Sequence, residues 1–396
     1  MKKSILIVFS VFFILLMSIV VFDVGYLFHG LRCTYFRGYK SAQIDDHKFF
    51  YNRTVESDSV IRIPLGFDYN KKRGELDSLV SVLEKSKSVA FLVIKNDSLR
   101  FEKYWDSGSR DSNTNSFSMA KSITSLLVGC AIRDGYIDGV EQAVNDFIPE
   151  FKQEGSGEGV KIKHLLEMSS GLSWLENYKR PISVTAKAYY GTNLKNLTLS
   201  REFIAPPGLT YKYQSGNTQI LGILLERAVG ESVSSYAGRS LWSGIGAENN
   251  ALWTLDYNGG IEKVFCCFNS NARDFAKIGL LMLSRGRVGE RVVVDEWYVD
   301  WLLSKPKLID GDDRFGRVGT TVDYYSNSWL VGRVLDKDVF YARGFLGQYI
   351  VVIPEINTVF VRLGKKEDDR SARKNEYMMT DNLRFFTEQV IKNYSL

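Results

Sequence analysis

A serine and a lysine one helical turn apart are the residues of this 396-residue sequence with the clearest capacity for chemistry. Ser118 and Lys121 stand at positions i and i+3, where apolar residues begin to recur with helical period. On a helix their side chains meet on one surface. Burial lowers the pKa of a lysine, and a neutral amine can then take the hydroxyl proton of the serine. The pair therefore predicts a serine nucleophile with its base in place.

The Ser-x-x-Lys pattern alone is weak evidence, because it also occurs at Ser304 and Ser371. Pro306 interrupts the first of these copies and opposes a continuous helix. The second follows the charged run 365–370, which is typical of a solvated loop. The copy at Ser118 begins a long apolar helix, although an ordinary helix N-terminal serine remains the alternative interpretation.

The composition describes a globular enzyme-sized chain, with 45% hydrophobic and 13% aromatic residues. A net charge of +5 with dispersed lysines is no footprint of nucleic-acid binding, so no nucleic-acid partner is expected. The histidines His29, His47 and His164 are far apart, and His164 is best explained as a packed structural residue. No metal-ligand spacing occurs, and we expect neither a metal nor an organic cofactor.

The N-terminus differs from the rest of the chain. An apolar run spans residues 5–22 behind two lysines, and about 19 residues of helix cross a bilayer. No small-x-small cleavage site follows, so an uncleaved anchor over residues 1–22 is favoured over a cleaved signal segment. This predicts a single-pass protein of the inner (cytoplasmic) membrane with its catalytic domain extracytoplasmic or periplasmic. Residues 23–75 form a lead-in or linker without clear period.

Strand patterns occur near both ends of the body, and helical patterns lie between them. Segments 89–94 and 99–104 predict a hairpin, preceded by a helix over 76–89. A second hairpin of nearly continuous apolar content, 349–353 with 358–363, predicts a central pair buried on both faces. We therefore expect one sheet assembled from about 76–116 and 256–396, with a mostly helical part over about 117–255.

Three further features complete the pattern. Amphipathic helices are predicted over 272–283 and near the C-terminus, where Leu383 and Phe386 face inward. Cys266 and Cys267 are adjacent and flanked by aromatic residues, so burial as small apolar side chains is expected. A vicinal disulfide between them is the less favoured alternative.

Several stretches agree with one family in order and spacing. The sequence resembles the class C β-lactamase-like, penicillin-binding-protein-like serine hydrolases, closest to the esterase and 6-aminohexanoate-dimer hydrolase branch. The resemblance implies an α/β (α+β) fold of β-lactamase/transpeptidase type, an antiparallel sheet flanked by helices with an inserted mostly helical domain. The matching stretches span roughly residues 85–390 and comprise 118–121, 162–172, 207–217, 266–274 and 344–349.

By this resemblance, Ser118 is the nucleophile, Lys121 its proton partner, and Tyr213 of the Tyr-x-Ser motif a second acid/base. A neighbouring cation such as Lys121 stabilises a phenolate, which could shuttle the proton of Ser118 to the leaving group. A buried tyrosine that caps the next helix is the alternative interpretation of Tyr213. Ser215 of the same motif would contact the substrate.

The resemblance also assigns an oxyanion site. Its two donors would be the backbone N–H groups of Ser118 and of Phe345, just past Gly344, each often worth about 3 kcal/mol. At the third motif, where relatives carry Lys-Thr-Gly or His-x-Gly, this chain has Ala342-Arg343-Gly344. Arg343 could replace the missing cation, but strand alternation could point it away from the cleft. Efficient β-lactamase activity is therefore disfavoured.

The sequence thus predicts that residues 76–396 form a membrane-anchored serine hydrolase that cleaves a small-molecule ester or amide through an acyl-enzyme on Ser118. The alternatives are a D-amino-acid peptidase or β-lactamase that acts on cell-wall peptides or β-lactams, and a non-catalytic binding protein on the same scaffold. Three aromatic residues of the helical part could wall the pocket, although core packing explains them equally well: Trp174, Tyr189 and Tyr190.

Overall fold

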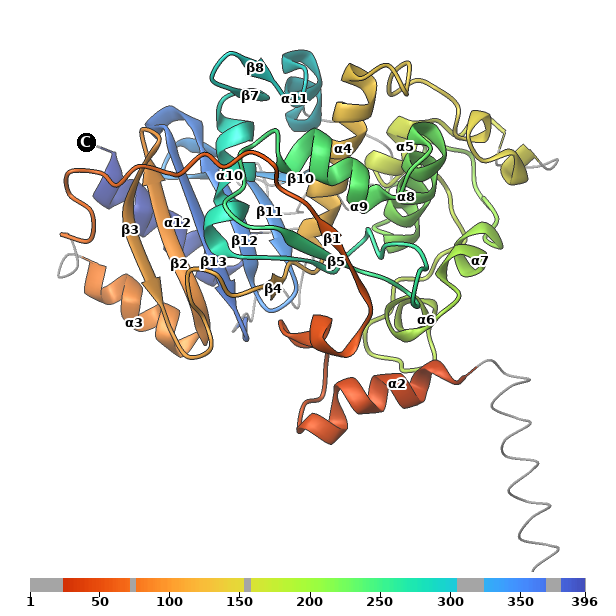
Figure 1. The fold of residues 1–396 in the computed structure, drawn as a ribbon, viewed down its shortest axis with the longest axis horizontal. Helices are drawn as coiled ribbons and strands as arrows, with labels where there is room; N and C mark the ends of the chain where they lie inside the picture. Colours follow the sequence, from red (N-terminus) through yellow and green to blue (C-terminus); the bar gives the residue numbers. More distant parts are fainter. Residues whose placement is uncertain (1–23, 72–75, 153–157, 305–323, 368–378, 396) are drawn as a thin grey trace, which may run out of the picture.

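The centre of the molecule is a seven-stranded antiparallel sheet (Figure 1). A computed structural model describes residues 24–71, 76–152, 158–304, 324–367 and 379–395. The spatial order of the strands is β3-β2-β13-β12-β11-β10-β9. Their bounds are β2 Ser88–Lys95, β3 Ser98–Tyr104, β9 Tyr324–Ser326, β10 Trp329–Val334, β11 Lys337–Gly344, β12 Gln348–Ile353 and β13 Thr358–Gly364.

Helices cover both faces of this sheet, because alternate side chains of each strand point to opposite faces. On one face α4 (Met119–Arg133) and α10 (Ala272–Leu283) pack on residues such as Ile350 and Val359. On the other face α3 (Asp77–Lys85) and α12 (Asp381–Tyr394) pack on residues such as Val351 and Phe360. The three-layer arrangement follows from strands that are apolar on both sides.

Both predicted hairpins are present. β2 pairs with β3, and β12 pairs with β13, whose other neighbour is β2. This last pairing joins segments more than 250 residues apart, as the prediction of one sheet from both ends requires. The helix α3 is shorter than the predicted range 76–89: it ends at Lys85, and Lys87 takes a left-handed conformation with φ 53° before the apolar run begins β2.

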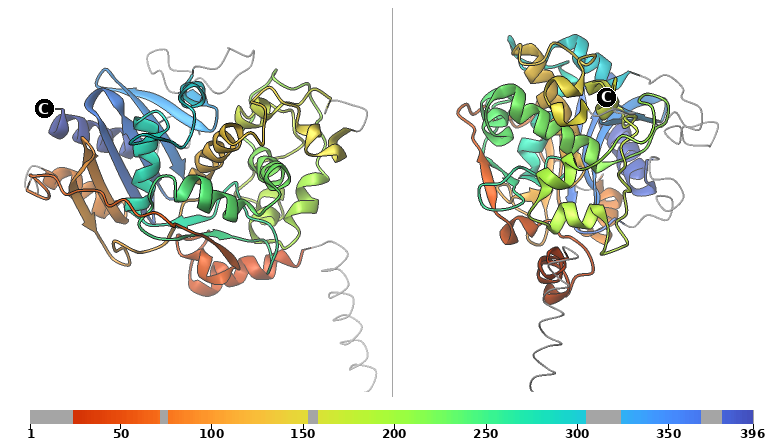
Figure 2. Two further views of the ribbon diagram at one scale, coloured as in Figure 1. Left: turned by 45° about the horizontal axis from the view of Figure 1, so that its top comes forward. Right: turned by 90° about the vertical axis from the view of Figure 1, so that its right-hand side faces the viewer.

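A mostly helical part lies beside the sheet, and α4, which Figure 2 shows between the two parts, packs against both α8 and β11. Two 15-residue helices, α4 and α8, pack against each other at its centre. The helix α8 spans Ser215–Val229. The other helices of the body are α5 Ile162–Leu166, α6 Val184–Tyr190, α7 Leu194–Leu199, α9 Val233–Tyr236 and α11 Glu296–Leu303, with short helical turns η4 Val144–Asp146, η5 Pro149–Lys152, η6 Ala237–Trp242 and η7 Pro354–Ile356.

A second, four-stranded sheet of order β1-β5-β6-β4 was not predicted. Its strands are only two to four residues long, too short for a period-two pattern to stand out. They are β1 Asn52–Val55, β4 Thr114–Asn115, β5 Ala251–Thr254 and β6 Phe268–Ser270, and a separate pair joins β7 Arg287–Val288 to β8 Arg291–Val292. Because β4 ends three residues before Ser118, this small sheet fixes the start of the nucleophile helix.

The lead-in is more ordered than a linker. It contains α2 (Tyr26–Cys33), the turns η1 (Tyr35–Arg37) and η2 (Asp46–Phe49), and β1 of the small sheet. The helix α2 packs against α6, and the views of Figure 2 agree on this placement. The segment therefore belongs to the folded body.

The expected membrane location is corrected by the structure. Among the residues it describes, no helix combines the length and the apolar character that a bilayer crossing needs. The proposed anchor, residues 1–22, lies outside the described residues. A single-pass inner-membrane protein is thus not supported, and neither is a membrane partner.

Cys266 and Cys267 are buried, as expected, but they are joined as a vicinal disulfide rather than kept as two free thiols. This disulfide was the less favoured alternative in the sequence analysis, where the flanking aromatic residues favoured two buried thiols. Here Cys267 takes a left-handed conformation with φ 68°.

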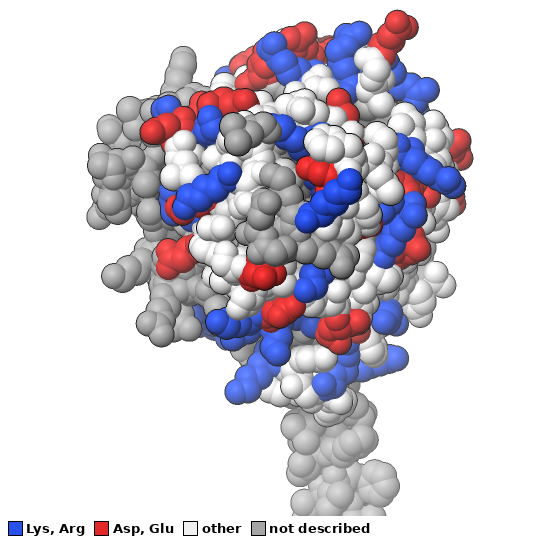
Figure 3. All heavy atoms as spheres, turned by 90° about the vertical axis from the view of Figure 1, so that its left-hand side faces the viewer, with Lys and Arg blue, Asp and Glu red and all other residues white. Residues whose placement is uncertain are grey.

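Charges are well mixed on the face shown in Figure 3, where Lys and Arg side chains lie among Asp and Glu side chains.

Candidate active site

Ser118 lies directly before the first residue of α4 and is partly exposed to solvent. From residue 114 to residue 131 every residue is buried except Ser118, which is half-buried. The preceding residue, Phe117, has φ 47°, a left-handed conformation that is rare for a bulky side chain and often marks functional turns. Strand β4 and this strained turn together place Ser118 at the edge of an otherwise buried segment.

Lys121 lies beneath that hydroxyl. Its Nζ is 3.2 Å from Ser118 Oγ and donates a hydrogen bond of 2.9 Å to the Phe265 carbonyl oxygen. The side chain is only 2% exposed. Burial lowers the pKa of Lys121 to about 8, partly offset by the charge of Glu176. A useful fraction of the amine is therefore neutral near pH 8.

Tyr213 joins this pair from the loop before α8. The centre of its ring lies 5.0 Å from Lys121 Nζ, so the amine sits over an aromatic face. A second ring, that of Tyr325, packs edge-on against Tyr213 with a centroid distance of 5.9 Å. The structure thus brings together the three residues predicted to be catalytic, from two segments about 95 residues apart in the chain.

Ser215, predicted to contact substrate, is 1% exposed at the first turn of α8. Its Oγ donates to Glu176 Oε1 over 2.8 Å, and its backbone N–H donates to Glu176 Oε2 over 2.7 Å. Trp174 Nε1 donates to the same carboxylate at 3.0 Å. A carboxylate at a helix N-terminus is favoured by the helix dipole. Ser215 therefore helps to hold Glu176, which sequence analysis did not single out.

The predicted oxyanion turn follows β11. Gly344 approaches the nucleophile turn so closely that a Cβ there would lie 2.0 Å from the Ser116 carbonyl oxygen. Phe345 follows, 49% exposed, with its ring edge-on to Phe117 at 5.5 Å. The turn is held from behind by Arg362, whose Nη1 donates to the carbonyl oxygens of residues 346 and 347 at 2.7 Å each.

Arg343 does not join this group. Residues 339 and 341 of β11 belong to the α12 face of the sheet, and by strand alternation residue 343 shares that face. Its Nη2 lies 3.5 Å from Glu367 Oε2, and the other oxygen of Glu367 accepts the Tyr349 hydroxyl. The prediction that Arg343 could replace the missing substrate cation is therefore corrected: the register directs its charge to the opposite side.

The three aromatic residues considered as pocket walls have other environments. Trp174 is 1% exposed and packs in the core. Tyr190 lies against His29 and Phe50 of the lead-in, with its ring 6.4 Å from each. Tyr189 packs edge-on to Phe50 at 5.7 Å. Packing in the core accounts for Trp174, and packing against the lead-in accounts for Tyr189 and Tyr190.

A cavity of 340 Å³ lies next to β4, and Ser118 is not among its lining residues. The lead-in supplies one wall through Gln43, Ile44 and His47, and Thr114 and Lys365 supply another. Among the described residues, no three His, Cys, Asp or Glu side chains gather into a group that could hold a metal ion.

Comparison with known proteins finds similar sequences. A family model described as Beta-lactamase matches residues 76–259, which include Ser118, Lys121 and Tyr213. The 6-aminohexanoate-dimer hydrolase of Paenarthrobacter ureafaciens is 26% identical over 320 residues, 74% of this chain and 76% of that protein.

Solved structures share the fold at lower identity. A Bacillus anthracis structure named as a 6-aminohexanoate-dimer hydrolase has a TM-score of 0.70 at 20% identity and covers 89% of this chain and 92% of that one. A family VIII carboxylesterase has a TM-score of 0.63 at 14% identity, over 85% of this chain and 99% of that one. The predicted β-lactamase/transpeptidase-like fold is thus confirmed. Over residues 76–259 the chain thus matches the Beta-lactamase family model, and its similarity to hydrolases and esterases supports a serine hydrolase.

Proposed function

We propose that this protein hydrolyses a small ester or amide through an acyl-enzyme on Ser118. The observation that carries the proposal is that Ser118 is the one half-buried residue in the otherwise buried stretch 114–131, with an amine of lowered pKa 3.2 Å from its Oγ. A nucleophile in hydrogen-bond reach of a base is the arrangement that covalent catalysis requires.

In the first step Ser118 Oγ attacks the carbonyl carbon, and its proton passes to the neutral amine of Lys121. The oxyanion that forms would be held by the backbone N–H groups of Ser118 and Phe345. When the bond to the leaving group breaks, a proton is delivered to that group, with Tyr213 placed to relay it. Water then attacks the acyl-enzyme, the acid leaves, and Ser118 recovers its proton.

An ester or amide substrate fits this site better than a β-lactam. The position that carries a cation in β-lactamases is Ala342 here, and Arg343 lies on the other face of the sheet beside Glu367. The amide branch gains support from the relative, whose name records a 6-aminohexanoate dimer as its substrate.

The test is a comparison of substrates on one preparation. We expect turnover of p-nitrophenyl acetate or butyrate, with or without turnover of the linear 6-aminohexanoate dimer, and no more than slow hydrolysis of nitrocefin. Ser118→Ala should lose the activity, with Ser304→Ala as the control because it lies in a second Ser-x-x-Lys pattern. Turnover of nitrocefin well above that of the esters would contradict the proposal.

A further inference from the structure

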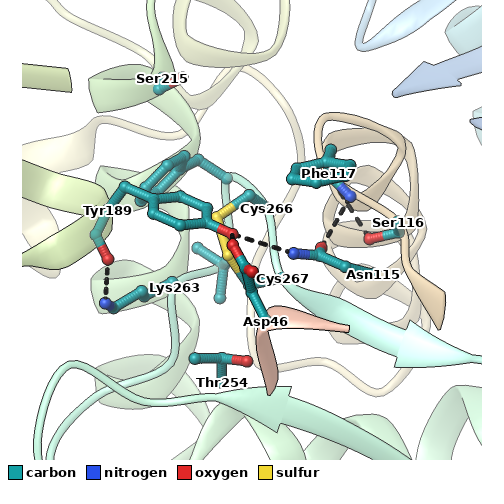
Figure 4. Close-up of a disulfide and its surroundings, with 12 residues drawn as sticks. Asp46, Asn115, Ser116, Phe117, Tyr189, Ser215, Thr254, Lys263, Cys266 and Cys267 are labelled. Carbon is teal, nitrogen blue, oxygen red and sulfur yellow. Dashed lines mark hydrogen bonds between the residues drawn. A yellow bond between two sulfur atoms is a disulfide. The ribbon is translucent and has the colours of Figure 1, made fainter. Parts of the chain in front are cut away.

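A chain of hydrogen bonds runs from the N-terminal segment to the nucleophile turn. Its last link is Asn115, whose Oδ1 accepts the Phe117 backbone N–H at 2.9 Å. Because that N–H can only donate, the other end of the Asn115 amide must be the NH₂ group. This group donates to the Tyr189 hydroxyl at 3.2 Å. Figure 4 shows these residues in line below the turn.

The hydroxyl of Tyr189 connects this series of hydrogen bonds to the lead-in, because it donates to Asp46 Oδ2 at 3.0 Å. Burial, and next the Asp46 charge, raise the pKa of Tyr189 well above its usual range, so this hydroxyl keeps its proton. Every link therefore has one donor and one acceptor, and a buried chain of this kind polarises and strengthens its members.

Asp46 is itself fixed. It is 1% exposed, its Oδ1 accepts from Arg37 Nη1 at 2.9 Å, and its Oδ2 also accepts the Gln43 backbone N–H at 3.0 Å. Burial raises the pKa of Asp46 to about 6, so the carboxylate is charged at the pH at which Lys121 becomes neutral. The segment also holds Asn115 directly, because the Ile44 carbonyl oxygen accepts the Asn115 backbone N–H at 2.8 Å.

The series of hydrogen bonds ends at Phe117, whose backbone conformation is strained. Phe117 has φ 47°, and such a conformation persists only where its surroundings determine it. A left-handed turn at residue 117 sets where Ser118 Oγ stands relative to Lys121. A displacement of about 1 Å at a nucleophile can cost about 100-fold in rate.

We propose that Asp46, Tyr189 and Asn115 are positioning residues for Ser118, through which the N-terminal segment completes the active site. This rests on the proposed function for its catalytic readout. None of the three touches the reacting atoms; each acts through the Phe117 turn. The lead-in thus contributes to the geometry of the active site and is more than a spacer.

The experiment compares two pairs of matched variants in the full chain. Tyr189→Phe removes the central hydroxyl, and Tyr190→Phe removes the neighbouring hydroxyl of the same helix. Asp46→Asn removes the terminal charge, and Asp45→Asn removes the other carboxylate bound to Arg37, which Tyr189 does not contact. For each variant, kcat and KM on the p-nitrophenyl ester and the thermal midpoint are measured.

We expect Tyr189→Phe and Asp46→Asn to lower kcat by about 10- to 100-fold, with KM within about threefold of the wild-type value. The kcat of the double variant Tyr189→Phe/Asp46→Asn should be little lower than that of either single variant, because both substitutions interrupt the same series of hydrogen bonds. Tyr190→Phe and Asp45→Asn should stay within about twofold. The rising limb of the pH profile should keep its midpoint, because Lys121 is untouched. The thermal midpoint of each variant separates this loss of kcat from a loss of folded protein.

Equal losses in the control variants, or a rise in KM with unchanged kcat, would overturn the proposal. A readout independent of catalysis separates it from the proposed function: amide hydrogen exchange of the peptide that contains residues 114–118. Exchange at residue 117 should speed up by about tenfold in Tyr189→Phe and not in Tyr190→Phe. Unchanged exchange would overturn the positioning role even in an active enzyme, and faster exchange would support it even if the ester were no substrate.

Discussion

Gly344 stands so close to Ser116 that a Cβ on residue 344 would lie 2.0 Å from the Ser116 carbonyl oxygen. The contact joins the end of β11, which carries the predicted oxyanion donor, to the turn that carries the nucleophile. The two halves of the predicted oxyanion site are thus held against each other by backbone, with no side chain between them.

The first prediction concerns this contact. Gly344→Ala must push the two backbones apart, so we expect kcat to fall by about 100-fold, comparable to the loss of one oxyanion donor. Gly25→Ala is the control, because its added Cβ would have nothing within 4 Å. The kcat values of the two variants are compared by steady-state kinetics, and their thermal midpoints show whether both are folded. A Gly344→Ala enzyme with wild-type kcat would show that the oxyanion site lies elsewhere.

The second prediction concerns pH. Burial lowers the pKa of Lys121 to about 8, and only the neutral amine can accept the Ser118 proton. The value of kcat/KM should therefore rise as pH increases through about 8 and level off above it. Lys121→Arg, which stays protonated throughout, should lose activity with no such limb. A wild-type profile that is flat between pH 6 and 9 would exclude Lys121 as the base.

Tyr213 is tested by removing only its oxygen. Tyr213→Phe keeps the ring that covers the Lys121 amine, so the fold and KM should change little. If the phenol relays a proton, kcat should fall by about 100- to 10,000-fold. Tyr211→Phe is the same substitution two residues away in the same loop and should remain within a few-fold. Comparable kcat values for the two variants would leave Tyr213 with a packing role.

The pairing of Cys266 with Cys267 gives a simple prediction in the test tube. The chain has four cysteines, and Cys33 and Cys130 are free. Denatured without reductant, the protein should therefore take up two alkyl groups, and after reduction it should take up four. Mass spectrometry counts them directly. Four groups without reductant would show that the vicinal pair is reduced.

Much of the fold could be predicted because its strongest signals are local. The apolar run 349–353 predicted a central strand, and 272–283 predicted a helix with the bounds that α10 has. The pair Ser118 and Lys121 was visible because both residues share one turn. The small sheet was missed because its strands are too short to show a period. The disulfide between Cys266 and Cys267 was the less favoured alternative, and the left-handed backbone at residue 267 cannot be read from the sequence.

Other features could not be predicted because they depend on how segments far apart in the sequence are placed relative to one another. Whether Arg343 faces the cleft is decided by strand parity, since a shift of one residue reverses the face. Asn115 gave no signal because its contact Tyr189 lies 74 residues away, and Glu176 gave none because it acts through Ser215. The lead-in had no period to recognise, since it is held by polar contacts such as that of Asp46 with Arg37.

The most direct test of the account is covalent labelling of Ser118. The protein is treated with a fluorophosphonate probe, and its intact mass is compared with that of Ser118→Ala. We predict one adduct on the wild-type protein, mapped by peptide analysis to the peptide that contains residue 118, and none on the variant. A wild-type protein that takes up no probe, or an adduct that persists in Ser118→Ala, would contradict the claim that this serine is the nucleophile.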